Sequence, residues 1–183
     1  SQRKIETRPI KGTISRGESD KEDKRNKKKL IKSIKDQAEL MMIVDLERND
    51  LAKVCEKGSI NVKVLKEVEA YRHVFHLVST IEGRLKETKS VIDVIRALFP
   101  GGSITGAPKI RAMEIINTLE SNIRNIYTGS IGYISFNRNS QFNIAIRTIY
   151  SDKDHFYFHA GGGIVSDSKA KIEWSEVHIK AKG

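Results

Sequence analysis

The sequence predicts an α+β protein built on an antiparallel sheet. Some segments carry apolar residues every three to four positions, which is typical of amphipathic helices. Others are short runs of β-branched and aromatic residues joined by polar turns, which is typical of hairpins. The chain has 183 residues, of which 38% are hydrophobic. That is enough for one domain with a core, so disorder is not expected.

The composition indicates the cellular compartment in which the protein works. Cys55 is the only cysteine, which excludes an internal disulfide and favours a reducing cytoplasm. The longest apolar run, Leu40 to Val44, is far shorter than the ~20 residues of a membrane span. No signal-like segment opens the chain. We therefore expect a cytoplasmic protein with no membrane partner.

The net charge of +10 raises the question of nucleic acid. Lysine and arginine concentrate between Lys21 and Lys35, interleaved with Glu22 and Asp23, and we expect an exposed loop that leads into a helix. No aromatic residue lies among these charges, so the stacking surface of single-strand binders is missing. The sequence disfavours nucleic-acid binding, although the charge could steer a small dianion.

The first half of the chain is expected to hold two strands and a long helix. Arg3 to Ile14 is strand-like around Pro9, but no upstream segment supplies a partner, so the chain resembles part of a longer protein. Val68 to Ile81 is dense in β-branched and aromatic residues and is expected to be one strand. A helix over about Leu30 to Asp50 is predicted from a spaced apolar stripe: Ile31, Ile34, Ala38, Met42 and Leu46.

The second half is expected to hold three helices and a meander. Ser90 should cap a helix that ends at Phe99, before Pro100-Gly101-Gly102. A helix from Pro108 to about Glu120 follows, with proline in the first turn. The last helix is expected from about Ser168 to Lys182. Between these helices we expect three antiparallel strands, at Ile131–Phe136, Phe142–Tyr150 and His155–Ala160.

Two glycine-rich segments could bind an anion. In Ala160-Gly161-Gly162-Gly163 the backbone N–H groups could approach a ligand, or the glycines could form a simple turn. Pro100 to Lys109 leads onto a helix N-terminus, where Ser103 adds a hydroxyl donor, or it only caps that helix. The segment Ala160 to Gly163 matches neither a Walker loop nor a dinucleotide fingerprint, so nucleotide binding is not expected.

Charged residues on two helices indicate a second kind of site. Glu173, Glu176 and Lys180 lie within about 60° of one another on a helical wheel. They form either an exposed ion-pair stripe or part of a Mg²⁺ site. Glu39 is expected on the apolar side of its own helix, where a carboxylate needs a partner.

Two more polar residues lie inside predicted strands. His76 alternates with Val74 and Val78, so it is either a core histidine or an acid–base group. Arg147 is expected to be buried in the strand Phe142–Tyr150. A buried guanidinium needs an anion, which could be a protein carboxylate or a ligand carboxylate.

Taken together, these segments resemble the chorismate-binding module shared by anthranilate synthase, aminodeoxychorismate synthase, isochorismate synthase and salicylate synthase. The similar runs follow the family order and cover nearly the whole chain. The resemblance implies a sandwich of antiparallel sheet and helices, of which residues 1–183 would be the carboxyl-terminal portion. The runs are Pro9 to Thr13, Glu39 to Leu51, Tyr71 to His76, Gly102 to Met113, Ile144 to Thr148 and Ala160 to Ser168.

The resemblance implies a role for each candidate residue. Chorismate is the implied substrate, and Mg²⁺ is the implied cofactor that Glu39 and Glu176 would hold against the ring carboxylate. Glu173 would support that site, and His76 would lie close to the reacting ring. Ser103 stands where relatives have threonine or serine. The residues implied to bind the substrate's carboxylates are Tyr127, Arg147, Gly161, Gly162, Gly163 and Lys180.

Lys11 separates the branches of this family. Anthranilate synthases resemble Pro9 to Thr13 but carry alanine at its centre, whereas aminodeoxychorismate synthases carry lysine. An unprotonated Lys11 amine would attack ring C2 as the C4 hydroxyl departs, and ammonia would then add at C4. The implied product is 4-amino-4-deoxychorismate, the precursor of p-aminobenzoate and folate. The implied partner is a glutamine amidotransferase subunit or domain that supplies ammonia.

Two alternatives stay open from the sequence. Anthranilate synthase or another chorismate-using enzyme is the first, and a non-catalytic basic domain is the second. Relatives also carry a general acid in a Ser-Pro-Glu context shortly before the position of Lys11, and this chain does not contain it. We therefore expect residues 1–183 to be inactive alone.

Overall fold

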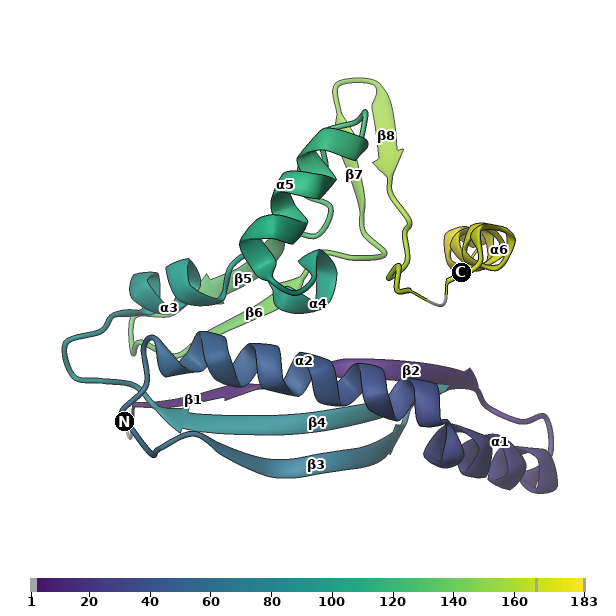
Figure 1. The fold of residues 1–183 in the computed structure, drawn as a ribbon, viewed down its shortest axis with the longest axis horizontal. Coiled ribbons are helices and arrows are strands. Elements are labelled where there is room, and N and C mark those ends of the chain that lie inside the picture. Colours follow the sequence, from purple (N-terminus) through teal and green to yellow (C-terminus); the bar gives the residue numbers. More distant parts are fainter. Residues whose placement is uncertain (1–2, 167, 183) are drawn as a thin grey trace. The chain divides into compact units, whose positions relative to one another are not determined.

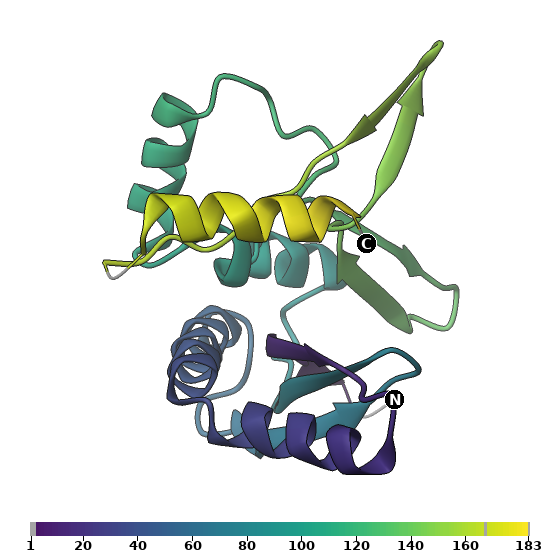
Figure 2. The same ribbon diagram turned by 90° about the vertical axis from the view of Figure 1, so that its right-hand side faces the viewer.

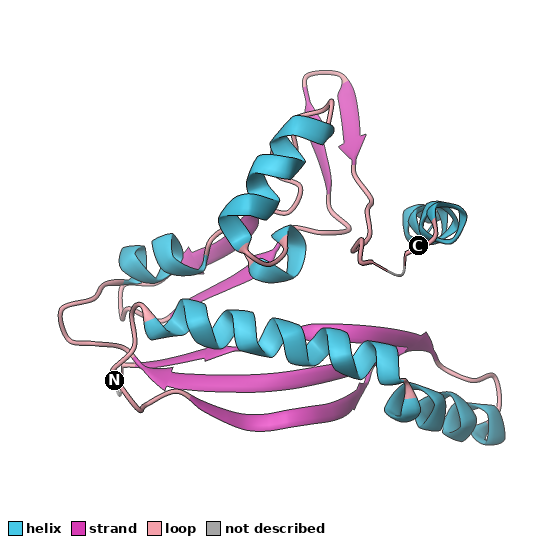
Figure 3. Cartoon of the chain, in the orientation of Figure 1, coloured by secondary structure: helices cyan, strands magenta, loops and turns pink. Residues whose placement is uncertain are grey.

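The computed structural model describes residues 3–166 and 168–182, and its helices and strands are labelled in Figure 1 and coloured by type in Figure 3. The chain splits into two compact units, Ser1–Ser103 and Ile104–Gly183, called here the first and second units. Helices and antiparallel strands occur in both units, which confirms the predicted α+β class.

The first unit is built on a four-stranded sheet. Its strands are β1 (Lys4–Thr7), β2 (Ile10–Ser15), β3 (Asn61–Ala70) and β4 (Val74–Arg84). β4 is central, and each of the other strands pairs with it antiparallel. β1 and β2 follow each other along one edge, since Lys4 pairs with Arg84 and Ser15 with Val74. The strand-like stretch expected around Pro9 forms two strands, β1 and β2, that are separated at Arg8-Pro9, and their partner β4 comes from later in the chain.

Helix α2 (Ile34–Ala52) packs on this sheet and lies along it in Figure 1. The predicted helix is confirmed, but it begins at Ile34 rather than at about Leu30, and the predicted buried face is wrong. Ile34 is 84% exposed and Met42 is 44% exposed. Apolar residues surround much of this helix, so the three-to-four spacing fits more than one face. The side chains that enter the core are Leu40, Ile43, Val44 and Leu51.

The exposed loop predicted in the lysine-rich segment is also wrong, because residues 24–29 lie inside helix α1 (Asp20–Lys32). The Ser19 hydroxyl caps this helix by accepting a hydrogen bond from the Glu22 N–H at 3.4 Å. Acidic residues occupy its first turn and basic residues its last turn, which suits the helix dipole. Leu30 is its buried contact. The N-cap and the charged residues at the two ends, rather than an apolar stripe, therefore specify α1.

The single strand predicted from Val68 to Ile81 is two strands, β3 and β4, joined by a turn over Tyr71 to His73. The Tyr71 N–H donates to the Val74 carbonyl at 2.8 Å and closes the turn. Between this sheet and the helices lie two buried clusters. One contains Val44, Leu51, Val54, Cys55 and Ile81, and the other contains Leu30, Leu40, Phe75 and Leu77.

Helix α3 (Val91–Leu98) is confirmed together with its predicted cap. Ser90 and Asp93 form a reciprocal capping box, in which each side chain accepts from the other residue's backbone N–H. The chain then enters the short helix α4 (Gly102–Thr105), which begins with the last two residues of the first unit.

The second unit contains two hairpins and two longer helices. Its elements are α5 (Lys109–Leu119), β5 (Ser130–Ile134), β6 (Ser140–Ile144), β7 (Ile149–Asp152), β8 (His155–Phe158) and α6 (Ala170–Lys182). The two helices agree with prediction, although Pro108 is the N-cap rather than a first-turn residue. The predicted meander is wrong, because β5–β6 and β7–β8 are separate two-stranded sheets. Figure 2 shows them pointing in different directions.

No helix in the described part of the chain is long and apolar enough to cross a membrane.

Candidate active site

Lys11 lies in a β-bulge at the edge of the first unit's sheet. Ile10 pairs with Val78 and Thr13 pairs with His76, so Lys11 and Gly12 together stand opposite one residue of β4. A bulge of this kind re-aims a side chain relative to regular strand alternation. Lys11 is half-buried. The direction of the Lys11 side chain therefore departs from the regular alternation of β2.

Gly12 makes this bulge possible. Its φ is 83°, a left-handed conformation that side chains disfavour. A Cβ at this position would also lie 2.9 Å from Cβ of Asp36 on α2. Both the backbone conformation and the contact with the helix thus require glycine beside Lys11.

His76 lies on β4 beside the bulge. Its Nδ1 is 2.8 Å from the Thr13 hydroxyl, so a hydrogen bond links the strand that carries Lys11 to the strand that carries His76. The Tyr71 ring meets the imidazole edge-on, with centroids 5.2 Å apart. His76 is half-buried. The predicted catalytic residues Lys11 and His76 are thus brought into one part of the sheet.

Glu39 and Ser103 are the remaining predicted site residues of the first unit. The Glu39 carboxylate on α2 is half-buried and lies 3.8 Å from the Lys35 ammonium. Ser103 is half-buried in α4, next to Gly102, which packs against Leu46.

The predicted glycine loop of the second unit is surrounded by other predicted residues. A Cβ on Gly161 would lie 2.7 Å from the Tyr127 hydroxyl oxygen, so the phenol rests directly against this backbone. Lys180 Nζ donates to the Gly161 carbonyl at 3.4 Å. A Cβ on Gly162 would have Glu173 Oε2 at 3.6 Å, whereas Gly163 has open space around it. The structure therefore gathers a phenol, an ammonium and a carboxylate around the loop.

The acids of α6 have defined partners. Glu173 accepts a hydrogen bond from the Ser168 hydroxyl at 2.7 Å, and Glu176 pairs with Lys180 at 2.6 Å. Carboxylate oxygens are the ligands that Mg²⁺ prefers, so Glu39, Glu173 and Glu176 fit this ion chemically. No cluster of three such ligands is found among the described residues. Glu39 belongs to the first unit and the other two to the second, so the metal site stays a prediction.

Arg147 corrects one expectation. It was expected inside a strand and buried, but it is exposed in the segment between β6 and β7. Its φ is 50°, which ends the extended conformation at this point. Its neighbour Ala145 is the buried residue. Because Arg147 is exposed, its guanidinium does not need a carboxylate partner within the protein and is accessible to an anionic ligand.

The sequence analysis missed Glu120 and Arg124, which support Tyr127. Arg124 donates two hydrogen bonds to Glu120, at 2.8 and 2.6 Å, and these lower the pKa of the Glu120 carboxyl. The Arg124 guanidinium lies 5.9 Å from the centroid of the Tyr127 ring. Burial raises the pKa of the Tyr127 phenol, which stays protonated and able to donate. The i, i+4 spacing of acid and arginine was the available signal.

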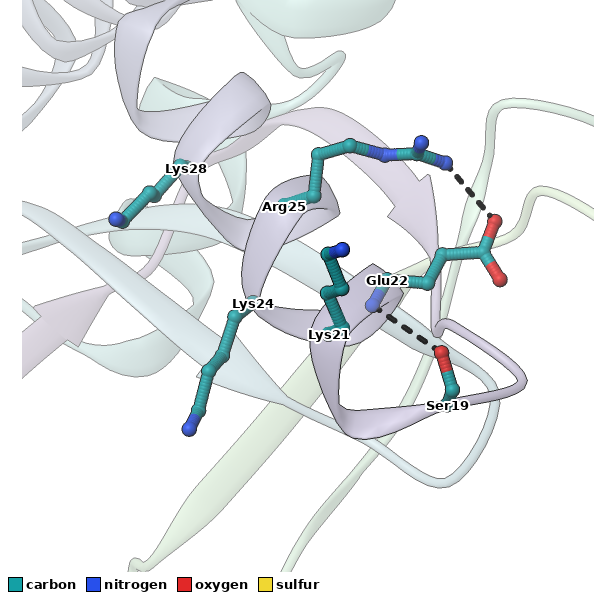
Figure 4. Close-up of a pocket in the computed structure, with 6 residues that line it drawn as sticks. All are labelled: Ser19, Lys21, Glu22, Lys24, Arg25 and Lys28. Carbon is teal, nitrogen blue, oxygen red and sulfur yellow. Dashed lines mark hydrogen bonds and ion pairs between the residues drawn. The ribbon is translucent and has the colours of Figure 1, made fainter.

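A separate surface hollow on α1, shown in Figure 4, contains none of the predicted site residues. Glu22 pairs there with Arg25 at 3.1 Å and Ser19 caps the helix. The residues that line it are Ser19, Lys21, Glu22, Lys24, Arg25 and Lys28.

Comparisons with known proteins agree with the resemblance drawn from the motifs. A family model described as chorismate binding enzyme matches residues 1–183. The chain is 49% identical to aminodeoxychorismate synthase component 1 of Bacillus subtilis, over 97% of this chain and 38% of that protein. It is equally 49% identical to anthranilate synthase component 1 of Aquifex aeolicus, over 98% of this chain and 36% of that protein.

A solved structure shows the same fold. Anthranilate synthase component I from Streptococcus pneumoniae is similar with a TM-score of 0.84 and 38% identity, over 100% of this chain and 40% of that chain. The chain thus spans about two-fifths of the length of the relatives it matches.

Proposed function

The chain belongs to the chorismate binding enzyme family, and we propose that the protein carrying it is an aminodeoxychorismate synthase. The proposed reaction converts chorismate and ammonia to 4-amino-4-deoxychorismate. The observation that carries this choice is Lys11, a lysine held in a bulge of β2 beside His76. Overall identity does not separate the branches, because relatives of both types match at 49%.

Lys11 would act as the nucleophile. Its neutral amine would form a bond to ring C2 of chorismate while the C4 hydroxyl leaves as water, after protonation by a general acid supplied from outside this chain. Ammonia would then form a bond at C4 while the C2–nitrogen bond breaks and returns the amine. His76, held by the Thr13 hydroxyl, would lie beside the ring with a fixed orientation.

The second unit would bind the substrate's carboxylates. The Tyr127 phenol, the amides of Gly161 to Gly163 and the Lys180 ammonium supply hydrogen-bond donors around one loop. The exposed Arg147 would add a guanidinium, and Ser103, at the end of the first unit, would add a hydroxyl. Fixing a dicarboxylate at several points places its reacting carbons, and correct placement alone supplies a large part of catalysis.

Glu39, Glu173 and Glu176 would hold Mg²⁺. The ion would neutralise the ring carboxylate of chorismate and orient it. The Ser168 hydroxyl and the Lys180 ammonium would keep Glu173 and Glu176 in place.

A glutamine amidotransferase is the proposed partner. The matched relatives are named as component 1, which indicates a second component in those enzymes. We expect the protein alone to use ammonia and to require the partner for glutamine, which rate measurements with each nitrogen source would test.

The deciding experiment is Lys11→Ala in the full-length protein, assayed with chorismate, Mg²⁺ and ammonia, with products identified by chromatography. We expect aminodeoxychorismate from the unmutated protein and a loss on the order of a hundredfold or more in the variant. Lys57→Ala, at an exposed lysine in a turn, is the matched control and should leave the rate unchanged.

Anthranilate synthase is the alternative, favoured by the equally similar relative from Aquifex aeolicus. Anthranilate as the main product of the unmutated protein would establish that alternative and remove the role proposed for Lys11.

A further inference from the structure

Four aromatic rings of the second unit form a ladder of nearly parallel planes, called here the aromatic ladder: Tyr127, His159, Tyr150 and Tyr157. Tyr127 and His159 have centroids 5.2 Å apart and planes 18° apart. His159 and Tyr150 are separated by 6.4 Å and 12°, and Tyr150 and Tyr157 by 5.1 Å and 14°. Nearly parallel rings at these separations are offset stacks, a favourable arrangement for aromatic side chains.

The β7–β8 hairpin supplies one end of the aromatic ladder. Tyr150 and Tyr157 face each other directly in the antiparallel register. His159 follows Tyr157 by two residues, and residues two apart in an extended chain lie on the same side. Asn125 Nδ2 donates to the Tyr150 hydroxyl at 3.2 Å, which ties the segment before Tyr127 to the hairpin. His159 is thus the ring that connects the hairpin to Tyr127.

Tyr127 is the end of the aromatic ladder that meets the glycine loop. Its hydroxyl rests against Gly161, and its ring is contacted by His159 and by the guanidinium of Arg124. These contacts matter because the strands around it supply little support, since every residue of β5 and of β8 is exposed. The ring contacts therefore contribute to the direction of the half-buried Tyr127 phenol.

We propose that His159 is a positioning residue that holds the Tyr127 hydroxyl over the Gly161 to Gly163 loop by stacking between Tyr127 and Tyr150. The inference rests on the proposed function, in which this loop binds a carboxylate of chorismate. His159 itself does not touch the substrate. A phenol already fixed in place loses less conformational freedom when the carboxylate binds, so affinity increases.

The effect should appear in KM. Tyr127 would contact a carboxylate rather than the reacting carbons, so its contribution is similar in the ground state and the transition state. Loss of one ring stack should raise KM for chorismate about three- to tenfold and leave kcat within about twofold.

The test compares three variants of the full-length protein by following chorismate consumption. His159→Ala and His159→Gln both remove the ring and should raise KM, whereas His159→Phe keeps the ring and should restore it. His155→Ala is the matched control, because His155 begins β8, four residues before His159, and within the described chain its ring contacts Tyr157 at a tilt of 41° rather than stacking on it. Thermal melting of each variant checks that it folds.

Three outcomes would overturn the proposal. An unchanged KM in His159→Ala means that the stack does not position Tyr127. A His159→Phe variant as impaired as His159→Ala means that the imidazole acts through its nitrogens. A fall in kcat at unchanged KM means that His159 acts on the reaction itself.

A second measurement keeps this test separate from the proposed function. Chorismate consumption is followed whichever product forms, so anthranilate as product would refute the function and leave the positioning test intact. If the protein does not consume chorismate, NMR of carbon-labelled tyrosine, assigned with Tyr127→Phe, reports the stack through ring-current shifts. We expect the ring resonances of Tyr127 to move in His159→Ala, where the stacked ring is lost, and to keep a ring-current shift in His159→Phe. Unchanged Tyr127 resonances in His159→Ala would overturn the proposal.

Discussion

The two units differ in what holds their candidate residues in place. In the first unit, Lys11 and His76 lie on a sheet backed by buried clusters that include Leu40, Leu51 and Ile81. In the second, Ala145 is the buried apolar side chain among the described residues, while Phe136 and Phe156 are exposed. Its candidate residues are placed by hydrogen bonds, ion pairs and the aromatic ladder instead.

The candidate residues of the two units are therefore held by two kinds of support. Burial of apolar surface is non-directional and stabilises the whole first unit, so single polar changes there should be tolerated by the fold. Polar and ring contacts are directional and act locally. Changes in the second unit should therefore alter the site more readily than they alter overall stability.

The largest expected effect is the contrast between core substitutions in the two units. Leu51→Ala removes a fully buried side chain and should lower the free energy of unfolding by about 2–5 kcal/mol. Phe156→Ala removes a side chain that is 81% exposed and should cost less than about 0.5 kcal/mol. Denaturant unfolding of both variants measures this. A large loss for Phe156→Ala would mean that another part of the protein covers the β7–β8 hairpin.

A second contrast concerns tolerance of an added methyl group. In Gly83→Ala the new Cβ would lie 2.7 Å from the Cys55 sulfur, and we expect a loss of about 1–3 kcal/mol. The double variant with Cys55→Ala should recover part of it, because the sulfur is gone. Gly163→Ala has no atom within 4 Å of the new Cβ and should change stability by less than about 0.5 kcal/mol. Equal losses at both glycines would contradict the contrast.

The third prediction concerns helix capping. Ser90→Ala removes one side of the capping box of α3 and should cost about 1 kcal/mol in thermal or denaturant unfolding. Ser175→Ala is the control, because that hydroxyl lies inside a helix and, among the described residues, donates to the carbonyl of Lys171 at 2.9 Å rather than capping a helix end. A loss at Ser175 as large as that at Ser90 would show that capping is not the cause.

The smallest effect should be a pH dependence at the sheet surface. Hydrogen bonds from Lys4 and Lys63 lower the pKa of Glu82 to about 2. A carboxyl group whose pKa is lower in the folded protein than in the unfolded chain stabilises the fold at a pH above its unfolded pKa, which is near 4.5. This stabilisation is lost as the pH falls towards the folded pKa of about 2. Glu82→Gln should flatten the stability profile in that window, and salt should reduce the difference. Glu87→Gln, at an exposed acid without an ion pair in the described chain, should follow the unmutated profile.

The sequence predicted elements well where the signal was local. The capping residue Ser90 and the stop after Phe99 defined α3, and the apolar spacing defined the existence of α2. Turns without the usual residues were missed. Tyr71 to His73 contains no glycine, proline, asparagine or aspartate, and Arg147 turns the chain at a positive φ that arginine rarely adopts. Both errors merged two strands into one.

For the site, the family resemblance implied roles for residues that local patterns left ambiguous, and these roles stay predictions. Periodicity could not choose between a core histidine and a functional one at His76. The aromatic ladder could not be predicted from the sequence, because Tyr150 and Tyr157 meet through the register of β7 and β8, and His159 and Tyr127 join them from segments outside these strands. The Lys11 bulge was equally hidden, since it is a property of the pairing with β4 rather than of β2 alone.

That bulge has an evolutionary consequence. The backbone around Lys11 is determined by Gly12 and by the pairing of Ile10 and Thr13 with β4, and none of these contacts uses the Lys11 side chain. A different residue at position 11 would therefore be presented on the same scaffold without a new fold. Under the proposed function, a substitution at position 11 would change the product without a change of architecture.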